Sequence, residues 1–255
     1  MSTSLDNLGE LQIVGDAGIS CDIPRPRAPK SPESFTPESL EVEFQRIAAK
    51  MIQFKFHEEL GMTPEEYIAS LPHFEMPSKE VVEQFDTPVI VDSRISPRRQ
   101  AELLGIQYDL NDEDLQDYET GDKAIVADKI PYTVWMNDGS GQINTSILSM
   151  RYTVIPMNKE AVRLGKLEWF QKYREENKLK KAVPMRAANI FDGLGLYIAH
   201  PEVLDHHMVD LSGTLIKNQE GAPTIKLHEN GTVSIARRFI ESYACSQIGQ
   251  ASCAA

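Results

Sequence analysis

The chain is poor in cysteine, and this scarcity argues against two classes of protein. Three cysteines, Cys21, Cys245 and Cys253, are spread over 255 residues without a C-x-x-C pair. A disulfide scaffold or a structural zinc site needs more thiols at closer spacing. A bond between Cys245 and Cys253 stays open, although so few cysteines indicate a reducing compartment.

Basic residues are also in deficit. The chain has 26 Lys and Arg against 38 Asp and Glu, which gives a formal net charge of -12. Phosphate groups repel such a surface, so we expect neither a general nucleic-acid binder nor a protein that binds anionic membranes. A nucleic-acid role would require Arg94, Arg98, Arg99 and the lysines near Lys180 to form one local patch.

Long apolar runs are missing as well. No segment approaches the roughly 20 apolar residues that a membrane-spanning helix needs. Residues 1–16 contain no basic residue and no apolar block, so they do not resemble a secretory signal. We therefore expect a cytoplasmic protein.

The common catalytic and nucleotide-binding motifs do not occur. Gly193 and Gly195 lack the third glycine and the preceding strand of a dinucleotide fingerprint, so close helix packing explains them better. The acidic segment 109–122 lacks the glycine and glutamate that an EF-hand loop requires, and we interpret it as a solvated loop. No G-x-S-x-G or H-E-x-x-H sequence is present. We expect neither a cofactor nor a metal ion.

Proline is abundant in one place, near the N-terminus. Residues 24–32 contain four prolines in nine positions, and proline fixes φ and removes backbone donors, which favours extended chain. The P-x-x-P spacings lack suitably placed basic residues for an SH3 ligand, so a stiff tether is the favoured interpretation. We predict a flexible Pro-rich arm over residues 1–35. The arm holds enough apolar residues to dock on a partner, namely Leu8, Leu11, Ile13 and Val14.

Helix-start signals follow the arm. A hydroxyl side chain followed by proline occurs at Thr36, Thr63 and Ser96, and this pair caps and opens a helix. The first helix is predicted to end at Gly61. Its buried face should consist of apolar residues at helical spacing, Leu40, Phe44, Ile47, Met51 and Phe54.

The remaining elements alternate between strand and helix patterns. Strands are predicted over residues 88–92, 106–110, 132–136, 143–155, 224–227 and 232–236, and helices over 78–85, 158–181 and 187–199, the last of them buried. We therefore predict one α+β domain over residues 36–255. Its N-terminal helices should pack on a mixed or antiparallel sheet.

Three of the six histidines lie close together, at His200, His206 and His207. Glu202 and His206 are four residues apart and would face each other on a helix. This spacing fits half a metal site, an acid–base pair or a plain salt bridge. Structural hydrogen bonding is the commonest of these roles, because the ligand density of zinc or di-iron sites is absent.

A second cluster follows a predicted strand end. Asp92 and Arg94 lead into a predicted helix that begins near Ser96 and carries Arg98 and Arg99 in its first turn. Backbone N–H groups at a helix start, together with guanidinium groups, form anion sites in many proteins. The favoured alternative is that these arginines pair with the many carboxylates of an acidic chain.

Several short patterns recur in one order along the chain. They are Phe85-Asp86-x-Pro88 with Val91-Asp92-x-Arg94, Gln100-x-Glu102-Leu103-x-Gly105-Ile106, Tyr132-Thr133-x-Trp135-x-x-Asp138-Gly139, and Leu196-Tyr197-x-x-His200-Pro201-Glu202 with His207, Asp210 and Gly213. Over roughly residues 85–215 this order resembles an uncharacterised bacterial protein family. The resemblance implies no mechanism. It nominates a set of positions for convergence on a ligand, namely Asp92, Arg94, Trp135, Asp138, His200, Glu202 and His207.

Two functions follow from these observations. The leading hypothesis is a non-enzymatic binding or assembly protein whose residues 1–35 dock on a protein partner. The alternative is an enzyme or small-molecule sensor that acts on an anionic metabolite through Arg94 and His200, with Arg98 nearby. That alternative requires the two side chains to meet in one pocket. Catalysis and homo-oligomerisation both stay open.

Overall fold

The computed structural model describes most of the predicted domain. The described residues are 35–82, 85–117, 130–137, 185–205, 208–211, 213–216, 221–239, 248–250 and 252–254. They form helices and mixed or antiparallel sheets, so the predicted α+β class is confirmed. The arm up to residue 34, the predicted strand 143–155 and the predicted helix 158–181 lie outside this range.

The first helix, α1 (Pro37–Gln53), begins where the sequence predicts it. The Thr36 hydroxyl accepts a hydrogen bond from the Ser39 N–H (3.1 Å), and the Ser39 hydroxyl accepts one from the Thr36 N–H (2.8 Å). This reciprocal pair is a capping box, which satisfies donors that the first turn leaves free. The predicted apolar stripe is buried from Leu40 to Met51.

The predicted end of this helix at Gly61 is wrong. Lys55 adopts a left-handed conformation with φ of +65°, which a right-handed helix cannot accommodate. The chain breaks there and forms a short helix, α2 (Phe56–Glu59), before Gly61 turns it at φ of +67°.

Three more short helices follow in the N-terminal half. They are α3 (Pro64–Ala69), α4 (Lys79–Val82) and α5 (Pro97–Leu103). Thr63 forms a second capping box with Glu66, and the Ser96 hydroxyl accepts a hydrogen bond from the Arg99 N–H. These hydroxyl–proline signals therefore mark helix starts correctly.

One sheet contains four antiparallel strands in the order β1-β4-β11-β5. They are β1 (Thr87–Val91), β4 (Tyr132–Asn137), β11 (Ser252–Ala254) and β5 (Met185–Ala187). In the register of the first pair, Pro88 lies opposite Trp135 and Val91 opposite Tyr132. The C-terminal strand thus lies between β4 and β5.

A second sheet contains five strands in the order β10-β6-β8-β9-β2. They are β10 (Ile248–Gln250), β6 (Met208–Asp210), β8 (Gly221–Leu227), β9 (Val233–Phe239) and β2 (Gln107–Tyr108). Both outer pairs are parallel and both inner pairs are antiparallel, so the sheet is mixed.

The described part of the acidic segment, residues 109–117, is more ordered than the predicted solvated loop. It contains a 3₁₀ turn, η2 (Asp112–Asp114), and a strand, β3 (Leu115–Asp117). That strand pairs with β7 (Thr214–Ile216). Leu115 is fully buried, and this apolar anchor gives the acidic segment a reason to pack.

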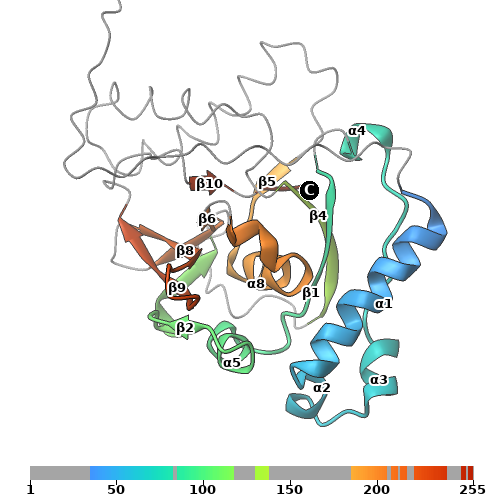
Figure 1. Cartoon of the computed structure of the whole chain (residues 1–255), viewed down its shortest axis with the longest axis horizontal. Coiled ribbons are helices and arrows are strands. Elements are labelled where there is room, and N and C mark those ends of the chain that lie inside the picture. The colour runs from blue at the N-terminus through green and yellow to red at the C-terminus, as the bar shows by residue number, and fades with distance from the viewer. Residues whose placement is uncertain are drawn as a thin grey trace, which may run out of the picture.

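A buried helix, α8 (Ile190–Ala199), lies between the two larger sheets (Figure 1). All its side chains are buried except that of Tyr197, which is half-buried, as expected of a helix that is apolar on every face. A Cβ atom built on Gly195 would lie 2.8 Å from the Ile90 carbonyl oxygen of β1, and one on Gly193 would lie 2.5 Å from Leu211 beyond β6. The two glycines therefore permit the close helix packing that the sequence predicts.

The outer helix α1 packs against β1 and α8 on one side of the molecule (Figure 1). A 3₁₀ helix, η4 (Pro201–Asp205), continues directly from the C-terminal end of α8. The C-terminal end of α8 therefore meets both α1 and η4. Ionic side chains gather at this junction.

Candidate functional site

The Asp92 carboxylate is the centre of one polar cluster. Asp92 follows β1 directly and is only 1% exposed. It accepts hydrogen bonds from the Tyr67 hydroxyl (2.9 Å) and from Nε and Nη2 of Arg94 (2.8 and 2.7 Å). The structure thus brings together Asp92 and Arg94, and it adds a tyrosine from α3.

Arg94 is engaged on all sides of its guanidinium group. Besides Asp92, its Nη1 donates to the Ser70 hydroxyl (2.8 Å), and its guanidinium lies 5.3 Å from the centre of the Tyr67 ring. Burial lowers the pKa of Arg94, but the hydrogen bonds and charge of Asp92 outweigh burial and raise it. Arg94 therefore stays charged and serves as an internal partner of Asp92.

The two arginines of α5 also have local partners. Arg98 donates through Nη2 to the Leu110 carbonyl and through its backbone N–H to Asp112 (3.3 Å), and its guanidinium lies over the Tyr108 ring. Arg99 pairs with Glu59 (2.9 Å) and Glu102 (2.8 Å). Arg99 therefore pairs with carboxylates, as the favoured alternative predicts, whereas the Arg98 guanidinium is held by a carbonyl oxygen and an aromatic ring.

Trp135 lies in a different part of the structure, beside Phe35, the last residue of the predicted arm. The ring of Phe35 meets the Trp135 ring edge-on at 4.9 Å, and the Phe74 ring lies 6.5 Å from it. Met76, two residues beyond Phe74, is 52% exposed. The end of the predicted arm is therefore fixed to β4. Asp138 and His207 lie outside the described residues.

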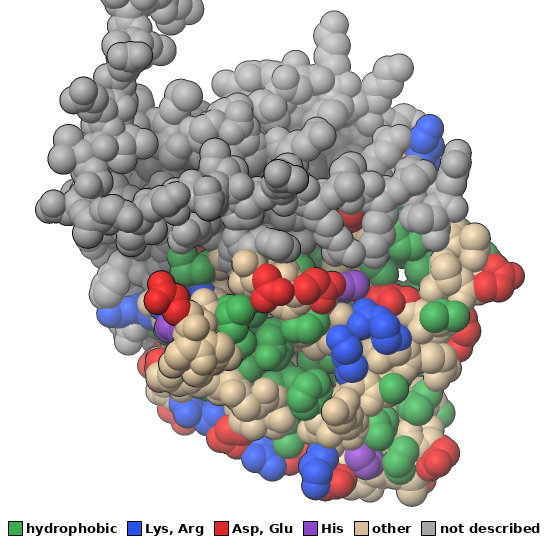
Figure 2. Space-filling model, viewed as in Figure 1, with side chains coloured by type: hydrophobic (Ala, Val, Ile, Leu, Met, Phe, Trp, Pro, Cys, Tyr) green, Lys and Arg blue, Asp and Glu red, His purple; other side chains and the backbone are tan. Residues whose placement is uncertain are grey.

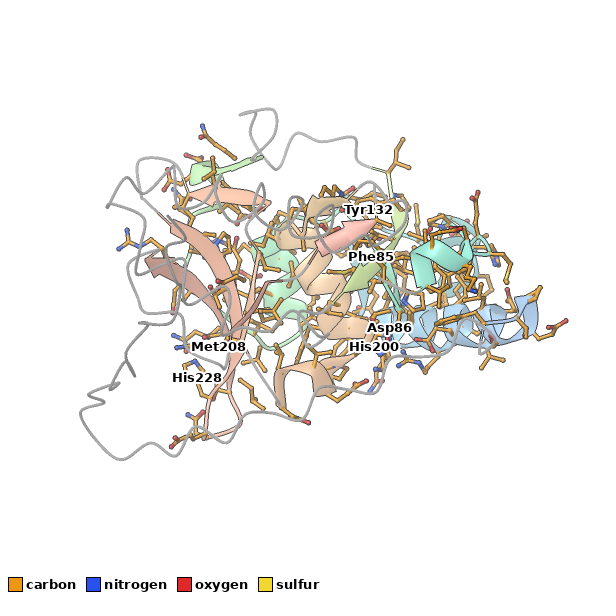
Figure 3. The ribbon with its side chains drawn as sticks, turned by 90° about the horizontal axis from the view of Figure 1, so that it is seen from above. Phe85, Asp86, Tyr132, His200, Met208 and His228 are labelled. Carbon is orange, nitrogen blue, oxygen red and sulfur yellow. The ribbon has the colours of Figure 1, made fainter. Side chains whose placement is uncertain are left out.

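His200 forms the third polar cluster, at the C-terminal end of α8 (Figure 3). Its side chain is only 6% exposed. Nδ1 lies 3.2 Å from Oε1 of Glu202 in η4, and Nε2 lies 3.3 Å from Oε1 of Glu43 in α1. The structure therefore brings together His200 and Glu202, two nominated positions, and adds a second carboxylate from α1, while His206, the predicted partner of Glu202, lies outside the described residues.

Two basic residues of α1 complete this cluster. Arg46 holds Glu43 through Nε (2.8 Å) and Nη2, while Lys50 Nζ donates to the carbonyls of Ile198 (3.0 Å) and Ala199 (3.2 Å). Burial raises the pKa of Glu43, but the hydrogen bonds from Arg46 and the nearby charges of Arg46 and His200 hold it well below its usual range. Burial, together with the charge of Arg46, lowers the pKa of Lys50.

A fourth cluster lies at the opposite end of α8, around the buried Asp192. This carboxylate accepts hydrogen bonds from both terminal nitrogens of Arg186, from the Tyr132 hydroxyl (2.9 Å) and from the Asn189 N–H (2.7 Å). The Cys253 thiol is free and buried. Its burial raises its pKa, and the charge of Asp192 raises it further.

The nominated residues therefore divide among several neighbourhoods. Arg94 is held by Asp92 and Ser70, whereas His200 lies against Glu43 and Glu202. Within the described part of the chain, no group of three or more His, Cys, Asp or Glu side chains is arranged to hold a metal ion. No helix in that part is long and apolar enough to cross a membrane.

Sequence reasoning missed the groups that surround His200 and Asp192. The capping box of Asn189 and Asp192 is readable from their spacing of three residues. Nothing in the sequence joins Lys50 to Ile198, because they are 148 positions apart. Contacts of this kind arise only when α1 packs on the end of α8.

Comparisons with known proteins returned no relative: no protein-family model, no curated protein and no solved structure matches this chain. The resemblance to an uncharacterised bacterial family therefore stays a prediction.

Proposed function

We propose that this protein is a non-enzymatic binding or assembly protein whose N-terminal arm docks on a protein partner. The observation that carries the proposal is the seating of Phe35 on Trp135, immediately before the capped start of α1. Because Phe35 is fixed against β4, the arm that precedes it starts from a defined place on the domain. Residues 1–34 come directly before this anchored position in the sequence.

The state of the charged side chains supports the same proposal. The guanidinium of Arg94 is held by Asp92 and Ser70, that of Arg98 by the Leu110 carbonyl, and that of Arg99 by Glu59 and Glu102. An anionic metabolite would have to displace these internal partners, and breaking a buried ion pair is costly. The alternative of an enzyme or sensor that uses Arg94 and His200 is therefore less favoured.

A crosslinking experiment tests the arm as a docking segment. A photoreactive amino acid at Leu11 would be activated in the source cells, and the crosslinked protein identified and purified. The purified full chain should bind that protein, whereas a chain lacking residues 1–34 should not. This deletion retains Phe35, so its circular dichroism and melting temperature should match those of the full chain.

A matched variant separates side-chain recognition from arm length. Replacing Leu8, Leu11, Ile13 and Val14 by serine keeps the length and the prolines, and it should weaken binding at least tenfold by removing apolar contacts. Sedimentation of the purified chain alone shows whether the partner is a second copy. Equal binding by the full chain and the deletion would refute the proposal.

A further inference from the structure

His200 is unusual because both nitrogens of a buried imidazole face carboxylates. Glu202 lies at 3.2 Å from Nδ1 and Glu43 at 3.3 Å from Nε2. The Nε2 atom is fully buried and has no well-directed hydrogen bond. The contact with Glu43 is therefore at ion-pair distance and depends chiefly on the charge of the ring.

A neutral imidazole cannot satisfy both carboxylates. It has one N–H and one lone pair, so whichever tautomer forms, a lone pair faces a carboxylate oxygen. Arg46 binds Glu43 through two nitrogens, which prevents that carboxylate from turning away. A protonated ring instead presents an N–H to each side, and both contacts become attractive.

The surrounding groups decide whether that positive charge is tolerated. Among the described residues, α1 contributes Glu43, Arg46 and Lys50 to this junction, and η4 contributes Glu202. Arg46 is paired with Glu43, and Lys50 points its ammonium at the last carbonyls of α8. The C-terminal end of a helix also favours a cation. Figure 2 shows acidic, basic and histidine side chains meeting at the border of an apolar area on this face.

We propose that His200 is a pH-sensitive latch, which ties α1 and η4 to the end of α8 when its imidazole is protonated. Histidine is the side chain type whose unperturbed imidazole changes charge between about pH 5 and 8. The latch stabilises the junction at the acidic side of this range, and its contribution disappears as the pH rises. This inference does not depend on the function proposed for the arm.

The test compares two histidines that contact carboxylates of the same helix. His73 is 62% exposed and lies 3.1 Å from Glu41 of α1, so H73Q is the matched control for H200Q. Melting temperatures would be measured at about pH 5.5 and about pH 8. H200Q should melt at a lower temperature than the wild type, and this difference in melting temperature should be at least about 2 °C larger at the acidic pH than at the alkaline pH. The reason is that the charged ring makes the extra contacts. For H73Q, the pH-dependent change in this melting-temperature difference should be less than half as large.

A second variant keeps the proposal testable if H200Q fails to fold. The Glu202 side chain is 55% exposed, so E202Q should fold normally. The loss of melting temperature in E202Q relative to the wild type should also be larger at acidic pH. At about pH 5.5, hydrogen exchange in the last turns of α1 should be faster in E202Q than in the wild type. The latch would be overturned if the loss of melting temperature in E202Q were the same at both pH values. The same holds for H200Q where that variant folds.

Discussion

At the residue scale, one charged side chain at each end of α8 matches the dipole of the helix. The buried Asp192 carboxylate lies in the first turn, where the N–H groups of the helix point, and Lys50 donates to the last carbonyls. This arrangement matches the helix dipole, which favours an anion at the N-terminus and a cation at the C-terminus. Asp192 and Lys50 thus follow the helix dipole, whereas Arg186, Glu43 and Glu202 at the same two ends pair with other side chains.

The Asp192 cluster provides the residue-scale prediction. Asp192→Asn removes the negative charge beside Arg186, and we expect the free energy of unfolding to fall by about 2–3 kcal/mol, because a largely buried guanidinium loses a charged partner. Urea denaturation measures the loss. Glu59→Gln, which removes one partner of the exposed Arg99, is the control and should change stability little. Equal losses in the two variants would contradict the role assigned to Asp192.

At the element scale, α8 is held by how closely it approaches its neighbours. Gly195 faces the backbone of β1, whereas Gly193 faces only the flexible end of the Leu211 side chain. Backbone cannot move without disturbing the four-stranded sheet, but a leucine side chain can rotate. The two glycines therefore differ in how much an added methyl group should cost.

The prediction compares the same substitution at these two positions. Alanine favours a helix over glycine by about 1 kcal/mol, so an open site would gain stability. Gly195→Ala should instead lose about 2 kcal/mol, because its Cβ would clash with the Ile90 carbonyl. Gly193→Ala should lose clearly less. Thermal and urea unfolding measure the stability loss of each variant. A larger loss for Gly193→Ala would show that the backbone of β1 shifts more easily than the Leu211 side chain.

The signals for individual elements were largely readable from the sequence. Hydroxyl–proline pairs gave the starts of α1, α3 and α5, and an apolar segment with two glycines gave the buried α8. These signals are local, since caps and helical periodicity involve residues three or four apart. The break at Lys55 and the strand β3 were not readable. Strand β3 depends on pairing with β7, and Lys55 carries none of the usual signals for a left-handed residue.

At the scale of the whole molecule, the C-terminus joins the two larger sheets. Strand β10 pairs with β6 in the five-stranded sheet, and after the single residue Ala251 strand β11 enters the four-stranded sheet. There β11 pairs with both β4 and β5, and its Cys253 side chain is fully buried. The described sheet connects β5 to β4 only through this last strand.

The whole-molecule prediction is that the end of the chain is needed for the fold. Deleting residues 252–255 removes β11 and leaves facing edges of β4 and β5 without partners, which costs buried hydrogen bonds and apolar burial. We expect loss of cooperative unfolding and of near-ultraviolet circular dichroism. Deleting Ala255 alone keeps all of β11 and should leave unfolding cooperative. A cooperative transition in the longer deletion would show that the sheets hold together without this strand.

The sequence by itself determined the α+β class, the helix starts and the buried central helix, because these depend on local caps, spacing and apolar content. It also nominated Asp92, Arg94, His200 and Glu202 as separate candidate positions, and the structure pairs Asp92 with Arg94 and His200 with Glu202. Only the tertiary structure decided that these pairs have separate partners, that Phe35 contacts Trp135, and that Glu43 and Lys50 meet the end of α8. Those contacts join distant parts of the chain, and packing between whole elements sets them rather than any local pattern.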